Sequence, residues 1–365
     1  ILKRSADYPD PDAMAGDTYL RQIINPERLK TVLLEMLEES HARYLLYTIA
    51  TDPIVEDGKL KGVVIENKSG RQAVLAKVVI DASGDGDIAA RAGADFIKGR
   101  ETDGAMQPVS LMFKVGGVDY ERAIFPSRFE DTIQIPAGEV QTLGKEHLPF
   151  PAGHVLLYRT SLPGVVTCNM TNCIEVDGTN AAELARATLV CRQQLQPILN
   201  FLHEYVPGYE NCYLLSSAAL IGVRETRHFK GLATITEDDI RQARVFPDWA
   251  VTYASFNFDI HNMSGSGLDA TGAQDAFKPT FYTIPYGCLV PEKLDGLLLA
   301  GRNISGTHMA HSNYRVMPIC ANMGQATGTA AAMCAKEGIE PRHVNVADLQ
   351  AILLQNGVLS PSENK

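Results

Sequence analysis

Residues 300 to 318, AGRNISGTHMAHSNYRVMP, gather side chains that can move protons and bind anions. His308 and His311 lie three positions apart, and imidazole is the side chain best suited to proton transfer near neutral pH. Arg315 follows them, and a guanidinium can pair with a carboxylate or phosphate. A His-x-x-His pair can also form half of a metal site, but no acidic or Cys partner is near in the sequence, so we expect no metal. The alternative that each imidazole is only a hydrogen-bonded wall residue stays open.

A second polar segment, GVRETRHFKG at residues 222 to 231, follows the apolar run AALIG. It contains Arg224, Glu225, Arg227 and His228. Alternating charges of this kind are typical of a solvated surface or a structural ion pair. The functional alternative is an arginine that holds a carboxylate or phosphate through two parallel hydrogen bonds.

Strand-to-turn-to-helix elements must position these side chains. In VVIDASGDGDIAARAGA, residues 78 to 94, a buried strand leads through small residues into an Ala-rich helix. Small residues let the backbone approach a ligand, and a helix N-terminus favours an anion. An ordinary Gly-rich turn is the alternative. The same pattern recurs with the run LLLA, the turn Gly301-Arg302-Asn303 and a helix starting near Val316. Open α/β sheets bind ligands beyond the carboxyl ends of their strands. Two such turns can therefore line one crevice.

Hydrophobic periodicity and turn signals predict the remaining elements. Asn25 and Pro26 begin a helix that runs to about residue 41, and Thr236 with Asp239 marks a capped helix start. The others are an antiparallel meander up to residue 75, a strand at 78–80, a long helix between Asn180 and Tyr205 with Pro197 inside, strands in 281–291 and 296–301, and helices at 316–337 and 346–356.

Composition limits the function classes. The chain has 365 residues, enough for two domains or one large one, and 45% hydrophobic with 21% charged residues is ordinary for a soluble globular protein. A net charge of -10 argues against a nucleic-acid partner, because phosphates need clustered Lys and Arg. No apolar run is long enough to span a membrane, so we expect no membrane partner. The cysteine usage described next favours a cytoplasmic location.

Seven cysteines are present, and none forms a CxxC pair. This usage favours reduced, mostly buried thiols over a disulfide framework or a zinc site. Cys168 and Cys173 have Cys-x-x-x-x-Cys spacing, but we also expect these two to be buried thiols.

Five segments together resemble a known family, and the resemblance covers the chain from about residue 20 to about residue 357. The family is the FAD-dependent oxidoreductase family of glutathione-reductase-like flavoproteins, a broad bacterial group distantly similar to fumarate reductase flavoproteins. The segments are VLLEMLEES, LKGVVIENKSGRQAVLAKVVIDASGDGDIAARAGADFIKGRE, MQPVSLMFKVGGVD, IGVRETRHFKG and LLLAGRNISGTHMAHSNYRVMPICANMGQATGTAAAMC.

The resemblance implies a mixed α/β (α+β) fold with two domains. An FAD/NAD(P)-binding three-layer β/β/α domain is formed by residues 1–108 and 280–345, and residues 109–279 form an inserted substrate (cap) domain. Residues 346–365 form a C-terminal helix and tail. The implied function is hydride transfer between FAD and a small organic substrate.

The resemblance also implies roles for individual residues. Side-chain chemistry and adjacency to the flavin-proximal helix add the hypothesis that His308 or His311 serves as acid or base, with Arg315, Arg224 and Arg227 as candidate ligands of an anion or the substrate. The helix that begins at Val316 and Met317 points its N-terminal amides at the flavin. The implied cofactor-binding residues are Ser83, Gly84, Asp85, Gly301, Arg302, Asn303, Val316 and Met317.

The chain departs from the family pattern at its start. Such families open with a strand and a GxGxxG fingerprint that binds the pyrophosphate, and this chain contains neither. We therefore expect a truncated protein, in which roughly 80 to 90 upstream residues with the first βαβ unit are missing or are supplied by a second chain. The alternative function is a non-catalytic relative that binds a ligand or partner through the cap domain. A homo-oligomer is the other partner we expect.

Overall fold

Two short strands that are far apart in the sequence pair at the centre of the fold. In the computed structural model, β4 (Val79–Asp81) and β15 (Leu297–Leu299) run parallel, with Leu297 opposite Val79 and Leu299 opposite Asp81. Both strands therefore end at the same edge, where the two predicted turns begin. The structure describes residues 1–5, 23–129, 131–269 and 280–361.

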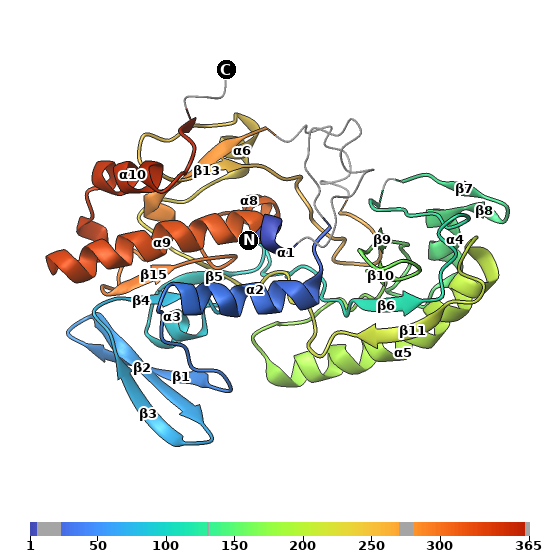
Figure 1. The fold of residues 1–365 in the computed structure, drawn as a ribbon, viewed down its shortest axis with the longest axis horizontal. Helices are drawn as coiled ribbons and strands as arrows, with labels where there is room; N and C mark the ends of the chain where they lie inside the picture. The colour runs from blue at the N-terminus through green and yellow to red at the C-terminus, as the bar shows by residue number, and fades with distance from the viewer. Residues whose placement is uncertain (6–22, 130, 270–279, 362–365) are drawn as a thin grey trace.

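A long helix, α9 (Met317–Glu337), packs along this strand pair (Figure 1). Its buried side chains Ile319, Met323, Ala326 and Ala330 are spaced four, three and four residues apart, so they form one helical face. The opposite face is solvent-accessible, and Met317 at its start is 71% exposed. Helix α10 (Val346–Gln355) packs against α9 and completes this side of the core.

The N-terminal part of the chain confirms the predicted helix and meander. Helix α2 (Pro26–Glu39) begins after Asn25, whose side chain accepts hydrogen bonds from two backbone N–H groups of the first turn. Strands β1 (Ile49–Glu56), β2 (Lys59–Asn67) and β3 (Gly70–Leu75) form an antiparallel sheet in the order β1-β2-β3.

A second hydrophobic core lies beside the first and contains residues from 109 to 212 (Figure 1). Its four-stranded sheet has the order β11-β6-β10-β9. The long helix α5 (Ala181–Tyr205) buries Cys191, Leu195, Ile198 and Leu202 in this core and continues through Pro197. Residues between 229 and 258, which the domain prediction placed with this unit, contribute to the first core instead.

The remaining elements are short. The predicted strand at 281–291 is shorter than expected, because it turns into a 3₁₀ helix after Pro285. The bounds are α1 (Leu2–Ser5), α3 (Asp87–Arg91), β5 (Phe96–Lys98), β6 (Phe113–Gly116), β7 (Gln134–Ile135), β8 (Gly138–Glu139), α4 (Val140–His147), β9 (Leu157–Arg159), β10 (Val166–Cys168), β11 (Tyr213–Ser217), β12 (Arg227–Phe229), α6 (Glu237–Arg241), β13 (Trp249–Ala254), β14 (Tyr282–Pro285), η1 (Tyr286–Leu289), α8 (His308–Tyr314) and η2 (Pro341–His343).

Mixed helices and small sheets confirm the predicted fold class. All seven cysteines are free thiols, and Cys320 alone among them is not fully buried, so the prediction for the cysteines is also confirmed. None of the helices in the described part of the chain combines the length and the apolar character that a membrane span requires.

Candidate functional site

An ion pair joins the two turns that follow β4 and β15. Arg302 Nη2 donates to Asp85 Oδ1 at 2.8 Å, and the Thr226 hydroxyl donates to the same oxygen at 2.8 Å. Asn303 Nδ2 donates to the Asp81 carbonyl at 3.0 Å. The structure thus brings the predicted residues of both turns together at one edge of the strand pair.

The turn after β4 requires its small residues. Ser83 Oγ donates to Asp81 Oδ1 at 2.6 Å and accepts from the Gly86 N–H at 3.1 Å, which fixes the turn. Gly84 has a φ of 89°, a left-handed conformation that other residues rarely adopt. A Cβ atom at Gly84 would lie 2.5 Å from Arg302 Nη1, so a larger residue would displace the guanidinium.

Several groups at this edge fit a dinucleotide cofactor. Gly301 has a φ of 105°, and a Cβ there would meet no atom within 4 Å, so open space adjoins its backbone. Arg302 Nε and Asn303 Oδ1 are buried without hydrogen-bond partners in the described structure. Val316 is the N-cap residue of α9, and its side chain makes no capping hydrogen bond. Backbone N–H groups in the first turn of α9 therefore remain available to an anion. The residues present therefore suit one end of a flavin dinucleotide.

Two histidines share the buried carboxylate of Glu225. His228 Nε2 and His308 Nδ1 donate to Glu225 Oε1 at 2.8 and 2.7 Å, and the Gln107 N–H donates to Oε2 at 3.0 Å. Burial alone would raise the pKa of Glu225, but the hydrogen bonds from His228 and His308 outweigh it and hold this pKa well below its usual range. With Glu225 only 1% exposed, the solvated-surface interpretation of GVRETRHFKG is wrong.

A helix that the sequence analysis missed carries both predicted histidines. Helix α8 starts after Thr307, whose hydroxyl accepts from the Ala310 N–H. His308 and His311 are 3% and 1% exposed, so neither lies in an open turn. His311 packs its ring edge-on against His228 with centroids 4.6 Å apart, and burial and the nearby His228 lower its pKa well below the ordinary value.

Ligand atoms of Glu225, His228 and His311 lie within 4.8 Å of one another, a spacing that could suit a metal ion. No acidic residue is near the histidines in the sequence, but the fold brings Glu225 beside them. However, Glu225 Oε1 already accepts hydrogen bonds from two imidazoles. A metal would have to displace both, so we interpret the group as a hydrogen-bonded network.

The three predicted arginines separate into two places. Arg315 Nη2 donates to the Asp259 carboxylate at 2.7 Å, and Arg224 Nη1 donates to the Pro108 carbonyl at 2.7 Å. Besides burial, repulsion from Arg315 contributes to the lowered pKa of Arg224, so we group these two arginines together. Arg227 instead lies at the turn after β4, where it pairs with Asp87 at 2.9 Å and stacks over Phe96.

Burial and charge perturb the groups around Arg224. Burial, followed by repulsion from Arg315, lowers the pKa of Arg224 to about 10. Burial and nearby positive charge lower the pKa of His154 to about 3 and that of His261 to about 4, so both imidazoles are neutral at pH 7. Burial would raise the pKa of Asp259, but His261 and Arg315 hold it well below its usual range.

The sequence analysis missed five residues of this region. Asp259 and His261 had a usable signal, because an acid and an imidazole two positions apart alternate with apolar residues in FDIH. Glu225 was considered only as part of a charged surface. Gln107 and His154 have no local signal, since single polar residues in apolar surroundings are common.

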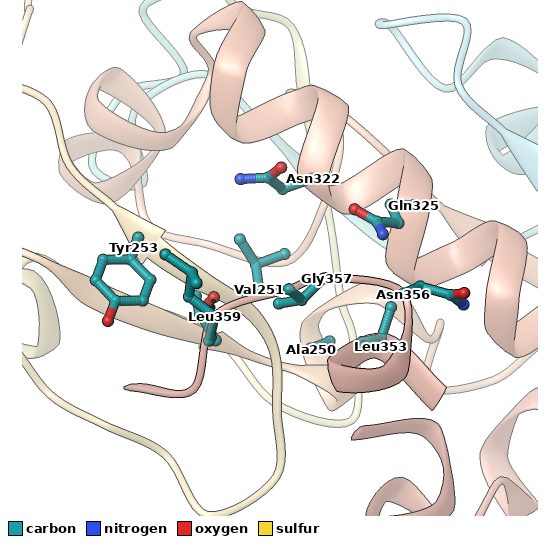
Figure 2. Close-up of a pocket in the computed structure, with 11 residues that line it drawn as sticks. Ala250, Val251, Tyr253, Asn322, Gln325, Leu353, Asn356, Gly357 and Leu359 are labelled. Carbon is teal, nitrogen blue, oxygen red and sulfur yellow. Dashed lines mark hydrogen bonds between the residues drawn. The ribbon is translucent and has the colours of Figure 1, made fainter. Parts of the chain in front are cut away.

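The hollow drawn in Figure 2 lies elsewhere, between α9, α10, β13 and the chain after α10. Its volume is about 220 Å³, and Asn322, Gln325, Tyr253 and Asn356 are among its lining residues. None of its lining residues carries a carboxylate, an imidazole or a cationic group.

Comparisons with known proteins agree with this chemistry. A sequence family described as FAD dependent oxidoreductase matches residues 2–353. No curated protein matches the chain significantly in sequence.

Among solved structures, a geranylgeranyl bacteriochlorophyll reductase-like protein from Thermoplasma acidophilum is 11% identical, with 94% of this chain and 62% of that chain covered and a TM-score of 0.47. L-proline dehydrogenase from P. horikoshii is 14% identical, with coverages of 86% and 56% and a TM-score of 0.34. The myxobacterial chondrochloren halogenase is 14% identical, with coverages of 92% and 56% and a TM-score of 0.37.

The chain spans less than two thirds of the length of each of these proteins. All three TM-scores are below 0.5, so the assignment rests on the sequence family, which covers nearly the whole chain. The chain belongs to the FAD dependent oxidoreductase family.

Proposed function

We propose that this chain carries the substrate-facing half of an FAD-dependent oxidoreductase, which transfers a hydride between an organic substrate and the flavin. Ser83, Gly84, Asp85, Gly301 and Arg302 would hold the cofactor. FAD, when bound, supplies the group that accepts or donates the hydride. The family match and the open, uncapped polar edge at the end of β4 and β15 support this assignment.

The hydrogen bond from His308 Nδ1 to Glu225 Oε1, 2.7 Å long, is the observation that carries the proposal. It commits Nδ1 to the donor role, so Nε2 is the nitrogen left to exchange a proton with the substrate. No described residue hydrogen-bonds to His308 Nε2, and it is not among the buried unpartnered atoms. A base oriented by a third group is the arrangement that general acid–base catalysis needs.

His311 has a different role in this proposal. Burial and the adjacent His228 hold its imidazole neutral, and its Nδ1 has no partner among the described residues. It packs edge-on against His228, which is the second donor to Glu225. We therefore assign His311 to positioning His228 and, through Glu225, His308.

The test follows flavin reduction in the full chain after FAD is added. The cofactor's absorbance band reports uptake, and its bleaching under anaerobic conditions with candidate organic acids reports hydride transfer. His308→Gln should take up FAD normally but bleach about 100-fold more slowly, and the pH dependence of the rate should change. His343→Gln, which alters a histidine of η2, is the matched control.

Equal bleaching rates and pH profiles in His308→Gln and the unaltered chain would remove His308 from the mechanism. A chain that takes up no FAD would contradict the flavin assignment and favour a non-catalytic ligand-binding relative.

A further inference from the structure

A second polar cluster adjoins the Glu225 network and shares Gln107 with it. We call it the arginine cluster, and it consists of Gln107, His154, Arg224, Asp259, His261 and Arg315. Its members come from five separate parts of the chain. The rings of His154 and His261 both pack edge-on against the Phe129 ring, with centroids 5.0 Å apart in each pair. Gln107 Oε1 accepts a hydrogen bond from the backbone N–H of His261 at 3.2 Å.

The cluster has one positive charge too many. Arg315 is paired with Asp259 at 2.7 Å, whereas Arg224 donates to the Pro108 carbonyl at 2.7 Å and has no carboxylate within 4.0 Å among the described residues. His154 and His261 are neutral at pH 7. Two guanidiniums and one carboxylate therefore leave a single uncompensated positive charge in a largely buried place.

The cluster also contains buried donors that no described group accepts from. His154 is 3% exposed and neither of its ring nitrogens has a partner, and Gln107 Nε2 and Arg315 Nε are likewise unpartnered. Buried polar atoms are rarely left unpaired, because each costs free energy. A neutral imidazole has only one N–H, so the unpartnered donors are Gln107 Nε2, Arg315 Nε and one ring nitrogen of His154, and they indicate a ligand that accepts hydrogen bonds.

We propose that the arginine cluster binds one carboxylate of the substrate, which makes the substrate a small monocarboxylic acid; this rests on the proposed function. A carboxylate carries one negative charge and matches the single surplus positive charge. A phosphate carries nearly two and would leave the cluster with an uncompensated negative charge beside Asp259, which lies against Arg315. The planar fork of Arg224 suits the two oxygens of a carboxylate.

Gln107 connects this binding site to the proposed proton-transfer site. Its backbone N–H donates to Glu225 Oε2 at 3.0 Å, and its side-chain oxygen accepts from the His261 N–H. Gln107 thus forms hydrogen bonds with a residue of each cluster and fixes their relative position. A substrate anchored by its carboxylate at Arg224 is held beside the network that orients His308, which positions the rest of the molecule for reaction.

The test measures anion binding to the full chain by ¹⁹F NMR line broadening, without turnover. The probes are trifluoroacetate and 4-fluorobenzoate as monocarboxylates, 4-fluorobenzamide as a neutral analogue and monofluorophosphate as a dianion. We expect at least one carboxylate to bind, and to bind more tightly than the amide or the fluorophosphate. Arg224→Gln should weaken that binding about tenfold or more, because it removes the charge and the fork. Arg122→Gln, which breaks an exposed pair with Glu210, should not change it.

Circular dichroism melting checks that each variant is folded. Arg224→Lys keeps the charge but loses the fork, so intermediate binding is expected even if Arg224→Gln does not fold. The proposal is overturned if neither carboxylate binds, if folded Arg224 variants bind as well as the unaltered chain, or if fluorophosphate binds more tightly. Flavin uptake is measured separately by absorbance, so loss of carboxylate binding with FAD uptake intact would overturn the substrate class and leave the proposed function standing.

Discussion

Replacing Glu225 by glutamine should destabilise the chain strongly, because this carboxylate accepts three hydrogen bonds in a buried place. The donors are His228 Nε2, His308 Nδ1 and the Gln107 N–H, at 2.8, 2.7 and 3.0 Å. A glutamine has one oxygen and one NH₂ group, so at least one of these donors would face an NH₂ and lose its acceptor. Losing one charge-assisted bond and burying one unpaired donor should together cost about 3 kcal/mol.

The pH dependence of this loss has a definite sign. The pKa of Glu225 is held well below its usual range in the folded chain, whereas in the unfolded chain it is about 4.3. A lowered folded pKa contributes stability that is fully present above the unfolded pKa and is lost as the pH falls toward the folded pKa. The gap between the unaltered chain and Glu225→Gln should therefore be largest near neutral pH and narrow below about pH 4.

Urea denaturation followed by circular dichroism measures this gap at several pH values. Glu139→Gln is the matched control, because Glu139 caps α4 by accepting from the Gln141 and Thr142 N–H groups through its two oxygens. The glutamine oxygen can still accept from one of these N–H groups, and at this more exposed position water can accept from the other. This control substitution should cost less than about 1 kcal/mol. A loss under about 0.5 kcal/mol in Glu225→Gln at neutral pH, or a gap that does not narrow in acid, would refute the account of the network.

Two further predictions concern the elements that build the site. Gly84→Ala should destabilise the chain by about 2 kcal/mol and weaken FAD uptake, because it strains a left-handed position and pushes the Arg302 guanidinium aside; an unchanged urea midpoint with normal uptake would show that the turn adapts. Asn25→Ala should lower the free energy of unfolding by about 1 kcal/mol through loss of the α2 cap, while FAD uptake stays unchanged. Thermal melting measures the stability and flavin absorbance measures the uptake. A loss of uptake would mean that α2 contributes to the cofactor site.

Local patterns predicted the long elements well. Helices α2, α5, α9 and α10 have apolar residues at helical spacing or strong terminal signals, and the meander has β-branched runs separated by turns. Helix α8 was missed because it has only seven residues, His308–Tyr314, and most of its buried side chains are polar. No hydrophobic period marks such a helix.

The polar clusters could not be predicted because their partners are distant in the sequence. Glu225 and His308 are 83 residues apart, and Asp85 and Arg302 are 217 residues apart. The residue types at the turns indicated anion binding, but only the fold shows that Glu225 is buried. Residues that are close in the sequence can also separate in the fold. Arg227 is three positions from Arg224, yet it pairs with Asp87 at the turn after β4, whereas Arg224 donates to Pro108.

The measurement that tests the central claim most directly is a titration of the full chain with FAD, followed by absorbance and by quenching of flavin fluorescence. The account predicts saturable binding that Asp85→Asn weakens about tenfold, because Asp85 holds Arg302 between the two turns. Asp52→Asn, which breaks an exposed pair with Arg71, should bind FAD like the unaltered chain. No saturable binding, or equal affinity in Asp85→Asn and Asp52→Asn, would contradict the claim that these two turns hold the flavin.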